Sequence, residues 1–488
     1  MISRRSLLAG GLGGAGMAAL GACTDAPAVD DVVRPDGSQV AAAEAARTPG
    51  TVRQVGLAPA AADVDLGGVT VSTWTYGGVL PGAPIRVTAG EQVKATVLNR
   101  LPDDTSVHWH GLALRNDADG VPHVTQNPIR PGGAYTYQFT AAHPGTYWFH
   151  PHTGVQLDRG LYAPLIVEDP REPLSYDDEW IVVLDDWLDG VGGRTPDAQL
   201  AELTKGMGAM MAGGHMMGMT SSLLGGDAGD VAYPHYLING RLPTDPQVHT
   251  GKPGRRLRIR FINAGGDTAF RVAIGGHTMT VTHTDGFPVV HRDTDALLIG
   301  MGERYDVLVT LGDGVFPLVA LAEGKDATAY ALIRTGVGRP ASTVSRPPEL
   351  NRRIVTYRQL AAGPEAALTD RTATRTITLK LTGGMMAYDW GFDGRRFDHG
   401  TVAHTVSAGE RVRLEFENTT TMWHPVHLHG HTFAIGGPSG PRKDTAIVLP
   451  GQTLTTLFDA DNPGRWMIHC HNAYHAEAGM MTLVGYRV

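Results

Sequence analysis

Four pairs of histidines occur along this chain, each with one residue between its members. The pairs are His108 and His110, His150 and His152, His427 and His429, and His469 and His471. Alternate residues of a β-strand point to the same face, so each pair can direct two imidazoles toward one site. Eight imidazoles with little carboxylate suit copper, and their number fits three ions. The pairs therefore predict a copper cluster.

A second metal site is predicted around Cys470, which lies between the two histidines of the fourth pair. Its thiolate should point to the opposite face of the strand from those histidines. His424 precedes the third pair, and His475 and Met480 follow Cys470 by five and ten residues. Two His, one Cys and a weak axial Met form a blue-copper electron-transfer site. An electron accepted there can pass through Cys470 and the adjoining backbone to the neighbouring histidines. The alternative is a buried structural thiol.

The strands that position these ligands are predicted from a unit repeated in residues 89–99, 253–263 and 408–418. Each copy is a Gly turn followed by a strand of period two that ends in Asn, with nine residues from Gly to Asn. The 63 Gly and 31 Pro, with few long helical patterns, also favour short strands joined by turns. Three such matches indicate three homologous β-domains rather than a solenoid.

The repeats predict which domains hold metal. The first and third histidine pairs begin nine residues after Asn99 and Asn418, whereas the same offsets from Asn263 fall on Val272 and Ile274. A second repeated segment, with Pro six residues before a His, carries the other two pairs. The middle domain is therefore expected to keep the fold without the ligands. The first and third domains are expected to face each other around the cluster.

Together these motifs resemble the four copper motifs of three-domain multicopper oxidases. The segments are HWHG from residue 108, HPH from 150, HPVHLHG from 424 and HCH from 469 with its trailing His and Met. The similarity extends over about residues 51–488 and is greatest to bacterial laccase-like and copper-resistance oxidases, including actinobacterial lipoprotein forms.

The resemblance implies an all-β fold of three consecutive cupredoxin-like Greek-key β-barrel or sandwich domains. Their expected bounds are residues 51–172, 173–345 and 346–488, with the blue copper in the third domain. The cluster would lie between the first and third domains. All ligands lie in one chain, so a monomer is sufficient.

The resemblance also divides the ligands among four copper ions. The type 1 ligands would be His424, Cys470, His475 and Met480, and the type 2 ligands His108 and His427. The type 3 pair would be held by His110, His150, His152, His429, His469 and His471. Members of the family oxidise one-electron donors at the type 1 copper and reduce dioxygen to water at the other three.

Dioxygen reduction consumes protons, so an acid is expected near the cluster. Asp119, just after the first copper motif, matches such an acid of the family, and a simple turn residue is the alternative. A second family acid directly follows the distal type 1 His. This sequence has Ala476 at that position, and Glu477, one residue later, is the candidate proton donor.

A methionine-rich stretch in residues 205–219 is a candidate for binding the electron donor. Its soft ligands are Met207, Met210, Met211, His215, Met216, Met217 and Met219. Thioethers favour Cu(I), which a flexible Gly/Met loop could bind near the type 1 site. Low-complexity filler is the alternative.

Met422, two residues before His424, is a second candidate ligand for Cu(I). It lies where copper-oxidising members of the family have a substrate-binding Met. The companion acid of that pattern is replaced here by Thr420, and core packing is the alternative interpretation of Met422.

The N-terminal residues 1–23 have the features of an export signal. Residues 3–8 (SRRSLL) form a twin-arginine start, and residues 20–23 resemble a lipobox in which Cys23 is lipidated. An ordinary signal peptide with a chance Cys is the alternative. Residues 24–50, without apolar periodicity, predict a flexible tether. We therefore expect export by the twin-arginine pathway and an extracytoplasmic lipoprotein held at the cell envelope by a membrane anchor on Cys23.

The leading functional hypothesis is an oxidase of Cu(I), with Fe(II) as a further donor, that confers copper tolerance. A laccase acting mainly on phenols or aromatic amines is the alternative within the same class. A non-catalytic copper-storage lipoprotein would not need the coupled type 1 site, and two-domain copper nitrite reductases lack a three-copper cluster. The net charge of -8 gives no reason to expect a nucleic acid partner.

Overall fold

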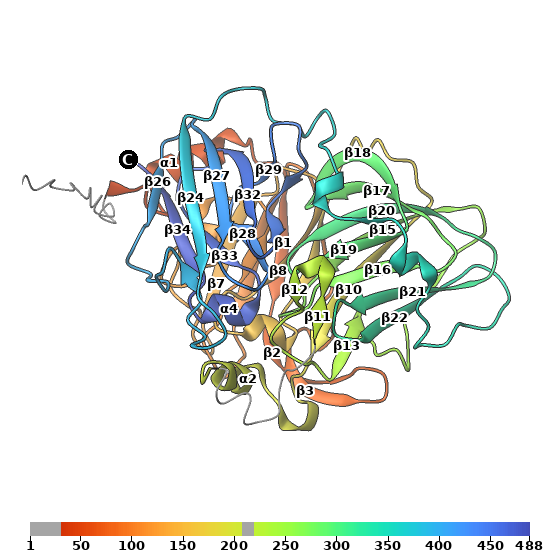
Figure 1. Ribbon diagram of the computed structural model, residues 1–488. Helices are drawn as coiled ribbons and strands as arrows, with labels where there is room; N and C mark the ends of the chain where they lie inside the picture. Colours follow the sequence, from red (N-terminus) through yellow and green to blue (C-terminus); the bar gives the residue numbers. More distant parts are fainter. Residues whose placement is uncertain (1–30, 207–218) are drawn as a thin grey trace, which may run out of the picture.

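The computed structural model describes residues 31–206 and 219–488. The export signal with Cys23 lies outside the described residues, as do Met207, Met210, Met211, His215, Met216 and Met217. The described chain is built mainly of β-strands, as the repeats predict (Figure 1). None of its helices within the described ranges has the length and hydropathy needed to cross a bilayer.

The first β-domain contains two sheets, with strand orders β1-β5-β7 and β4-β9-β8-β6, and the hairpin β2-β3. Its strands are β1 (Val52–Leu57), β2 (Pro59–Asp65), β3 (Thr70–Tyr76), β4 (Ile85–Thr88), β5 (Gln92–Leu98), β6 (His108–His110), β7 (Ala134–Thr140), β8 (Gly145–His150) and β9 (Ala163–Glu168). The two histidine-bearing strands, β6 and β8, are antiparallel neighbours, and His108 lies opposite His150.

The second β-domain contains two six-stranded sheets, β13-β10-β15-β20-β17-β18 and β14-β22-β21-β16-β19-β23. Its strands are β10 (Asp178–Trp187), β13 (His235–Ile238), β14 (Val248–Thr250), β15 (Arg256–Asn263), β16 (Phe270–Ile274), β17 (Met279–Thr284), β18 (Phe287–Thr294), β19 (Ala296–Ile299), β20 (Arg304–Thr310), β21 (Val315–Ala322), β22 (Ala327–Arg334) and β23 (Ile354–Val355). β23 lies beyond the expected boundary at residue 345, yet it pairs with β19. The second sheet therefore includes residues that the sequence assigned to the third domain.

The third β-domain contains a six-stranded sheet, β25-β24-β27-β32-β29-β30, and a five-stranded sheet, β26-β34-β33-β28-β31. Its strands are β24 (Arg375–Thr382), β25 (Gly391–Phe392), β26 (His404–Val406), β27 (Arg411–Asn418), β28 (His424–Leu428), β29 (Phe433–Ile435), β30 (Arg442–Lys443), β31 (Thr445–Val448), β32 (Thr453–Asp459), β33 (Arg465–Cys470) and β34 (Met481–Tyr486). His427 on β28 lies opposite His469 on β33, the same pairing as in the first domain.

Short helices and one small hairpin complete the fold. The helices are α1 (Ser38–Ala46), α2 (Pro196–Leu203) and α4 (Ala473–Glu477), with the 3-10 turns η2 (Asn116–Ala118), η3 (Gln156–Arg159), η4 (Val191–Gly193), η5 (Ser222–Leu224), η6 (Pro348–Asn351) and η7 (Tyr357–Gln359). The hairpin is formed by β11 (Thr220–Ser221) and β12 (Gly226–Asp227). Figure 1 shows α2 and α4 close to each other, at the lower end of the first and third domains.

The repeated Asn has one structural role in all three domains. Its side-chain amide donates to a carbonyl four or five residues ahead and to a second carbonyl thirty or more residues ahead. These acceptors are Asp103 and Ile129 for Asn99, Thr268 and Ile299 for Asn263, and Met422 and Val448 for Asn418. Each Asn donates to two backbone carbonyls and so joins the end of its strand to two other segments of the domain, which explains its recurrence at the strand end.

The expectation of a flexible tether is wrong for residues 31–50. Val33 donates its amide to the carbonyl of Tyr486, and α1 follows with Val40 buried. Glu44 accepts hydrogen bonds from the amide and the hydroxyl of Thr140, both at 2.7 Å. Few apolar residues are needed for this packing, because a buried carboxylate with two donors also fixes the segment. The pattern of apolar residues alone could not reveal it.

Candidate metal centres

The structure brings all eight paired histidines together between the first and third domains. They come from β6, β8, β28, β33 and the residues that directly follow these strands. Their nitrogens form three triads in which the ligand atoms lie within 4.8 Å of one another. The triads are His108 with His110 and His427, His110 with His150 and His471, and His152 with His429 and His469. The last two triads contain the six residues assigned to the type 3 pair, and the first contains both type 2 residues.

Unpartnered nitrogens test whether this cluster fits metal. Nε2 of His108, His150, His152, His427, His429 and His469, and Nδ1 of His471, are buried without a hydrogen-bond partner. A buried polar atom without a partner costs free energy, and an imidazole nitrogen can recover it by binding a metal. Seven such atoms on the clustered histidines fit copper ions, which the chemistry of an all-imidazole site also favours.

The opposite ring nitrogens are held by backbone carbonyls, and the contacts repeat between the two domains. His108 donates from Nδ1 to the carbonyl of Asp119 at 2.8 Å, and His427 donates to that of Asp444 at 2.9 Å. In β8 and β33, Nδ1 of His150 and of His469 lies 2.8 Å from the carbonyl oxygen of the residue that follows each histidine. These bonds fix the rings so that Nε2 faces the metal space.

Two buried carboxylates cross from one domain to the histidines of the other. Asp119, the predicted acid of the first domain, accepts from Nδ1 of His429 at 3.0 Å. Asp444 of the third domain lies 3.0 Å from Nε2 of His110. Burial opposes ionisation of Asp444, but Arg304 overcomes this effect and holds its pKa well below the usual range. Each carboxylate therefore orients a ligand that the facing domain supplies.

Sequence reasoning found Asp119 and missed Asp444. Asp119 lies twenty residues after Asn99, whereas Asp444 lies twenty-six residues after Asn418. The loop between the copper strand and the acid differs in length, so the repeat could not locate the second acid. The useful signal would have been an acid directly before β31.

The second centre surrounds Cys470, whose side chain is buried. Its Sγ lies 3.6 Å from Nδ1 of His424 and 3.7 Å from Nδ1 of His475. The backbone of Met480 accepts a hydrogen bond from the amide of Cys470 at 3.0 Å, so these predicted ligands are neighbours. Asn472 caps α4 and thereby orients His475. All four side chains are buried. The donor set matches a blue-copper site.

The outer nitrogen of each type 1 histidine has its own polar partner. Nε2 of His424 lies 2.8 Å from the hydroxyl of Thr420, and Nε2 of His475 lies 2.9 Å from Oδ2 of Asp230. Asp230 comes from the second domain and also accepts from the hydroxyl of Tyr388 at 2.6 Å. Sequence reasoning missed Asp230, because nothing in its local sequence distinguishes it from a loop acid.

Glu477 lies beside the cluster. With the type 3 residues His150, His152, His469 and His471 it lines a cavity of about 30 Å³. Burial raises the pKa of Glu477 to about 7, and the charge of Asp197 adds to the effect. The cavity is the size of a water molecule or two. A protonatable carboxyl that is partly exposed thus lines the space beside the type 3 histidines.

The methionine candidates separate. Met422 is only 1% exposed and belongs to the main hydrophobic core, which favours the packing interpretation over Cu(I) binding. Met219 is partly exposed. Gly206, at the other end of the methionine-rich stretch, is so close to Met386 that an added Cβ would lie 2.4 Å from its carbonyl oxygen. Met386 is 73% exposed and lies two residues before Tyr388.

Three family models described as multicopper oxidase match the chain, over residues 60–172, 179–337 and 370–487. The multicopper oxidase MmcO of Mycobacterium tuberculosis is 50% identical over 492 residues, covering 99% of this chain and 96% of that protein. A copper resistance protein A homolog of Pseudomonas syringae pv. tomato is 30% identical and covers 86% of this chain and 89% of its own length.

Solved structures agree with the three-domain architecture. The crystal structure of a laccase from Botrytis aclada superposes with a TM-score of 0.75 and 27% identity, covering 90% of this chain and 88% of that one. With the matches to the family, this superposition confirms three consecutive cupredoxin domains as the fold of the chain.

Proposed function

This chain belongs to the multicopper oxidase family, and on that premise we propose that it oxidises Cu(I), accepts Fe(II) as a further donor, and contributes to copper tolerance. When bound, the four copper ions supply one-electron chemistry on the donor side and dioxygen reduction on the cluster side. The residues described above decide which donor approaches, how the ligands are oriented and where protons enter.

One observation carries the choice of donor. His475, the outer type 1 ligand, has no exposed surface and is covered by Asp230, Tyr388 and the ring of Trp390, whose centroid lies 4.3 Å from that of the imidazole. A bulky phenol would have no direct access to this imidazole edge. A cation could instead be held near Asp230, because a buried carboxylate attracts positive charge.

The described residues on either side of the methionine-rich stretch connect it to Asp230. Its described end, Gly206, packs on Met386, and Met386 precedes the Tyr388 that donates to Asp230. On its other side, Asp230 follows Met219 by eleven residues. Soft thioethers would therefore capture Cu(I) close to the carboxylate that contacts the type 1 ligand. We assign Met207, Met210, Met211, His215, Met216, Met217 and Met219 to this capture.

The covalent route for the electron follows β33. His475 and Cys470 meet at the type 1 site, and Cys470 is bonded through the backbone to His469 and His471 of the cluster. Asp119 would orient the two cluster histidines that its carboxylate contacts. Glu477 would supply protons to the space that it shares with the type 3 histidines.

A laccase that acts on phenols is the second candidate function. The similarity to the Botrytis aclada laccase favours it.

We also propose that the chain is exported by the twin-arginine pathway and held at the cell envelope by a lipid on Cys23. Globomycin treatment, which blocks lipoprotein processing, would leave an unprocessed precursor if Cys23 is the lipidation site, and a Cys23→Ala variant would be released from the membrane fraction.

The test of the donor is oxygen uptake by the copper-loaded protein with anaerobically prepared Cu(I) or a phenolic dye. Replacing residues 207–218 by a Gly/Ser segment of equal length should lower the rate with Cu(I) about tenfold, the effect of about 1.4 kcal/mol of lost donor binding. The dye rate serves as the control and should stay unchanged. Equal loss with both donors would contradict a special role of the methionine-rich stretch. Dye turnover with negligible Cu(I) oxidation in the intact chain would contradict a cuprous oxidase.

A further inference from the structure

The described residues of the second domain include none of the cluster histidines, yet one turn of this domain touches the cluster. Residues 300–303 connect β19 to β20, and an added Cβ on Gly302 would lie 2.8 Å from Cδ2 of His471 and 3.1 Å from Cε1 of His110. Gly302 also has a φ of +82°, which favours glycine. Only a residue without a side chain allows this turn to approach the two imidazoles so closely.

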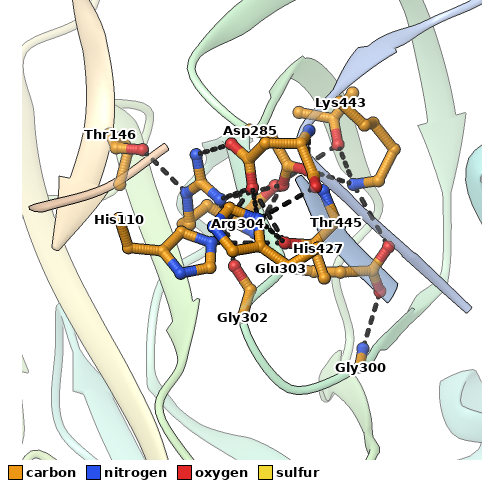
Figure 2. Close-up of polar contacts among 12 residues, drawn as sticks. His110, Thr146, Asp285, Gly300, Gly302, Glu303, Arg304, His427, Lys443 and Thr445 are labelled. Carbon is orange, nitrogen blue, oxygen red and sulfur yellow. Dashed lines mark hydrogen bonds and ion pairs between the residues drawn. The ribbon is translucent and has the colours of Figure 1, made fainter. Parts of the chain in front are cut away.

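From this turn a buried chain of charges runs away from the cluster (Figure 2). Arg304 donates to both carboxylate oxygens of Asp444, at 2.8 and 2.6 Å. Asp285, in the turn between β17 and β18, accepts from the amides of Arg304, Asp444 and Thr445. The chain therefore links the second domain to the carboxylate that holds His110.

The far end of the chain is Glu303. Nζ of Lys443 lies 3.1 Å from Oδ2 of Asp285 and 3.1 Å from Oε1 of Glu303. Oε2 of Glu303 accepts from the amide of Gly300 at 2.7 Å. Every side chain from Asp444 to Glu303 is 0–1% exposed, so the charges interact with little screening by solvent.

The formal charges show what is special about Glu303. Asp444 and Asp285 balance Arg304 and Lys443, so the group is neutral when Glu303 is protonated and carries one negative charge when Glu303 is ionised. Burial raises the pKa of Glu303 to about 7, although Lys443 opposes this effect. The two charge states are therefore close in free energy at neutral pH.

Glu303 also has a path to solvent. It lines a cavity of about 210 Å³ together with Tyr305, Tyr357 and residues of η5 and η7. Ser222 and Arg358, on the lining of this cavity, are exposed, so it reaches the surface. The hydroxyl of Tyr305 is buried there without a hydrogen-bond partner. A cavity of this size with polar groups on its wall can hold water.

The groups that face Glu303 are few. They are Lys443 from β30, Asp285 from the β17–β18 turn, Tyr305 from β20, and Tyr357 and Arg358 from η7. Burial raises the pKa of Tyr305 well above its usual value, so Tyr305 keeps its proton. At Lys443, burial favours the neutral amine, but the charges of Asp285 and Glu303 outweigh this effect and raise its pKa. The amine therefore stays charged.

The buried chain of charges from Glu303 to Asp444 does not conduct protons as far as the cluster. Between Asp285 and Asp444 the links are backbone amides and the guanidinium of Arg304, and neither releases a proton at ordinary pH. The coupling between Glu303 and the ligand histidines is therefore electrostatic.

We propose that Glu303 is a charge-compensating residue of the cluster, which takes up one proton from the water-accessible cavity when an electron reaches the site beside His110 and His427. The O–H bond forms on the carboxylate and breaks in a hydronium ion of solvent, while the electron comes from the donor through Cys470. On reoxidation the same proton returns to solvent. Glu303 acts through Lys443, Arg304 and Asp444, so it is a positioning residue, and the inference holds whichever donor is oxidised.

The test compares Glu303→Gln with Glu349→Gln in the copper-loaded full chain. Glu349 is a buried glutamate of η6 in the second domain that does not contact this charge chain. Anaerobic reduction with dithionite near pH 7 is followed by infrared difference spectroscopy and by a pH indicator. The unsubstituted protein and Glu349→Gln should gain a protonated-carboxyl band. Glu303→Gln should lose that band and take up about half a proton fewer per chain, because a carboxyl with a pKa of about 7 is already half protonated at pH 7. An unchanged band and proton count in Glu303→Gln would overturn the inference.

A second variant narrows the entrance and leaves the ion pairs intact. Ser222→Trp should slow the appearance of the carboxyl band after reduction severalfold without changing its final size. The same rate as in the unsubstituted protein would exclude this cavity as the route. Equal copper content and equal type 1 and type 2 signals in all variants show that both centres are occupied, and dithionite makes both measurements independent of Cu(I) oxidation.

Discussion

The first and third domains have histidines that fit a copper site at the positions where the second domain has Val272 and Ile274. All three share the strand, the glycine turn and the terminal Asn with its pair of buried carbonyl contacts. The fold is therefore maintained by one set of residues and the chemistry by another. The second domain keeps the first set only, and it contributes Asp230 and Gly302 to the two centres that the other domains build.

The largest difference between the domains is expected when a cluster histidine of the third domain is replaced. His427→Ala should abolish dioxygen reduction, with a loss greater than about 100-fold, since removal of residues that merely orient ligands already costs 10–100-fold. Electron paramagnetic resonance should show loss of the type 2 signal. Val272→Ala at the corresponding depth of the second domain should cost about 1–3 kcal/mol of stability and leave the signal intact. Equal loss of signal in both variants would contradict the division of roles.

The two crossing carboxylates allow a finer comparison. Asp444→Asn and Asp119→Asn should each lower oxygen reduction or copper affinity about 10–100-fold, because each orients a histidine of the facing domain. Asp444→Asn should also lower the stability of the metal-free protein by about 3 kcal/mol, since it removes the carboxylate that Arg304 hydrogen-bonds and leaves only Asp285 to balance this buried charge. Urea unfolding of both metal-free variants checks this difference, and equal midpoints would refute it.

The contact between the second and first domains should depend on acid. Asp306 lies buried between Arg258 and Arg260 and accepts from Thr146 of the first domain. Burial opposes its ionisation, but the two arginines lower its pKa to about 2. Because the folded-state pKa lies below the unfolded value, the ionised carboxylate stabilises the folded protein above about pH 4. This stabilisation is lost as pH falls toward 2. The stabilisation is about 2–3 kcal/mol. Unfolding of the metal-free protein between pH 5 and 2 should show this loss, and Asp306→Asn should remove this part of the acid dependence.

The smallest expected effect concerns the feature that all three domains share. Asn263→Ala leaves two buried carbonyls without donors and should lower stability by about 1–3 kcal/mol without changing copper content. Asn418→Ala should cost a similar amount and also change the type 1 absorbance, because Asn418 holds the carbonyl of Met422 and the hydroxyl of Thr420 beside His424. An unaltered type 1 spectrum in Asn418→Ala would limit the Asn to a purely structural role.

The sequence could indicate that the paired histidines gather at one place, because each pair follows a repeated segment at a fixed offset. His108 and His427 illustrate this, since the period of two fixes which face of the strand they occupy. Residues that approach from other domains could not be predicted in the same way. Asp230, Arg304 and Glu303 lie in loops or turns whose partners depend on how the domains pack, and no local pattern encodes that arrangement.

For segment 31–50 and for Met422, the local sequence suggested a role that the long-range contacts of the fold do not support. Composition suggested a tether, but Val33 and Glu44 find partners on two domains. Family position suggested a substrate ligand at Met422, but its side chain fills the core. In both cases the long-range contact, which the sequence does not display, decides the role.

Copper analysis and oxygen uptake of Cys470→Ser provide the most direct test of the electron route. Cys470 supplies the one thiolate of the type 1 triad, and its backbone joins that triad to both neighbouring cluster histidines. We expect the variant to lose the type 1 ion and its visible absorbance, to keep the three ions of the cluster, and to consume no oxygen with Cu(I) or with a phenolic dye. Undiminished oxygen uptake with either donor would contradict an electron route through Cys470.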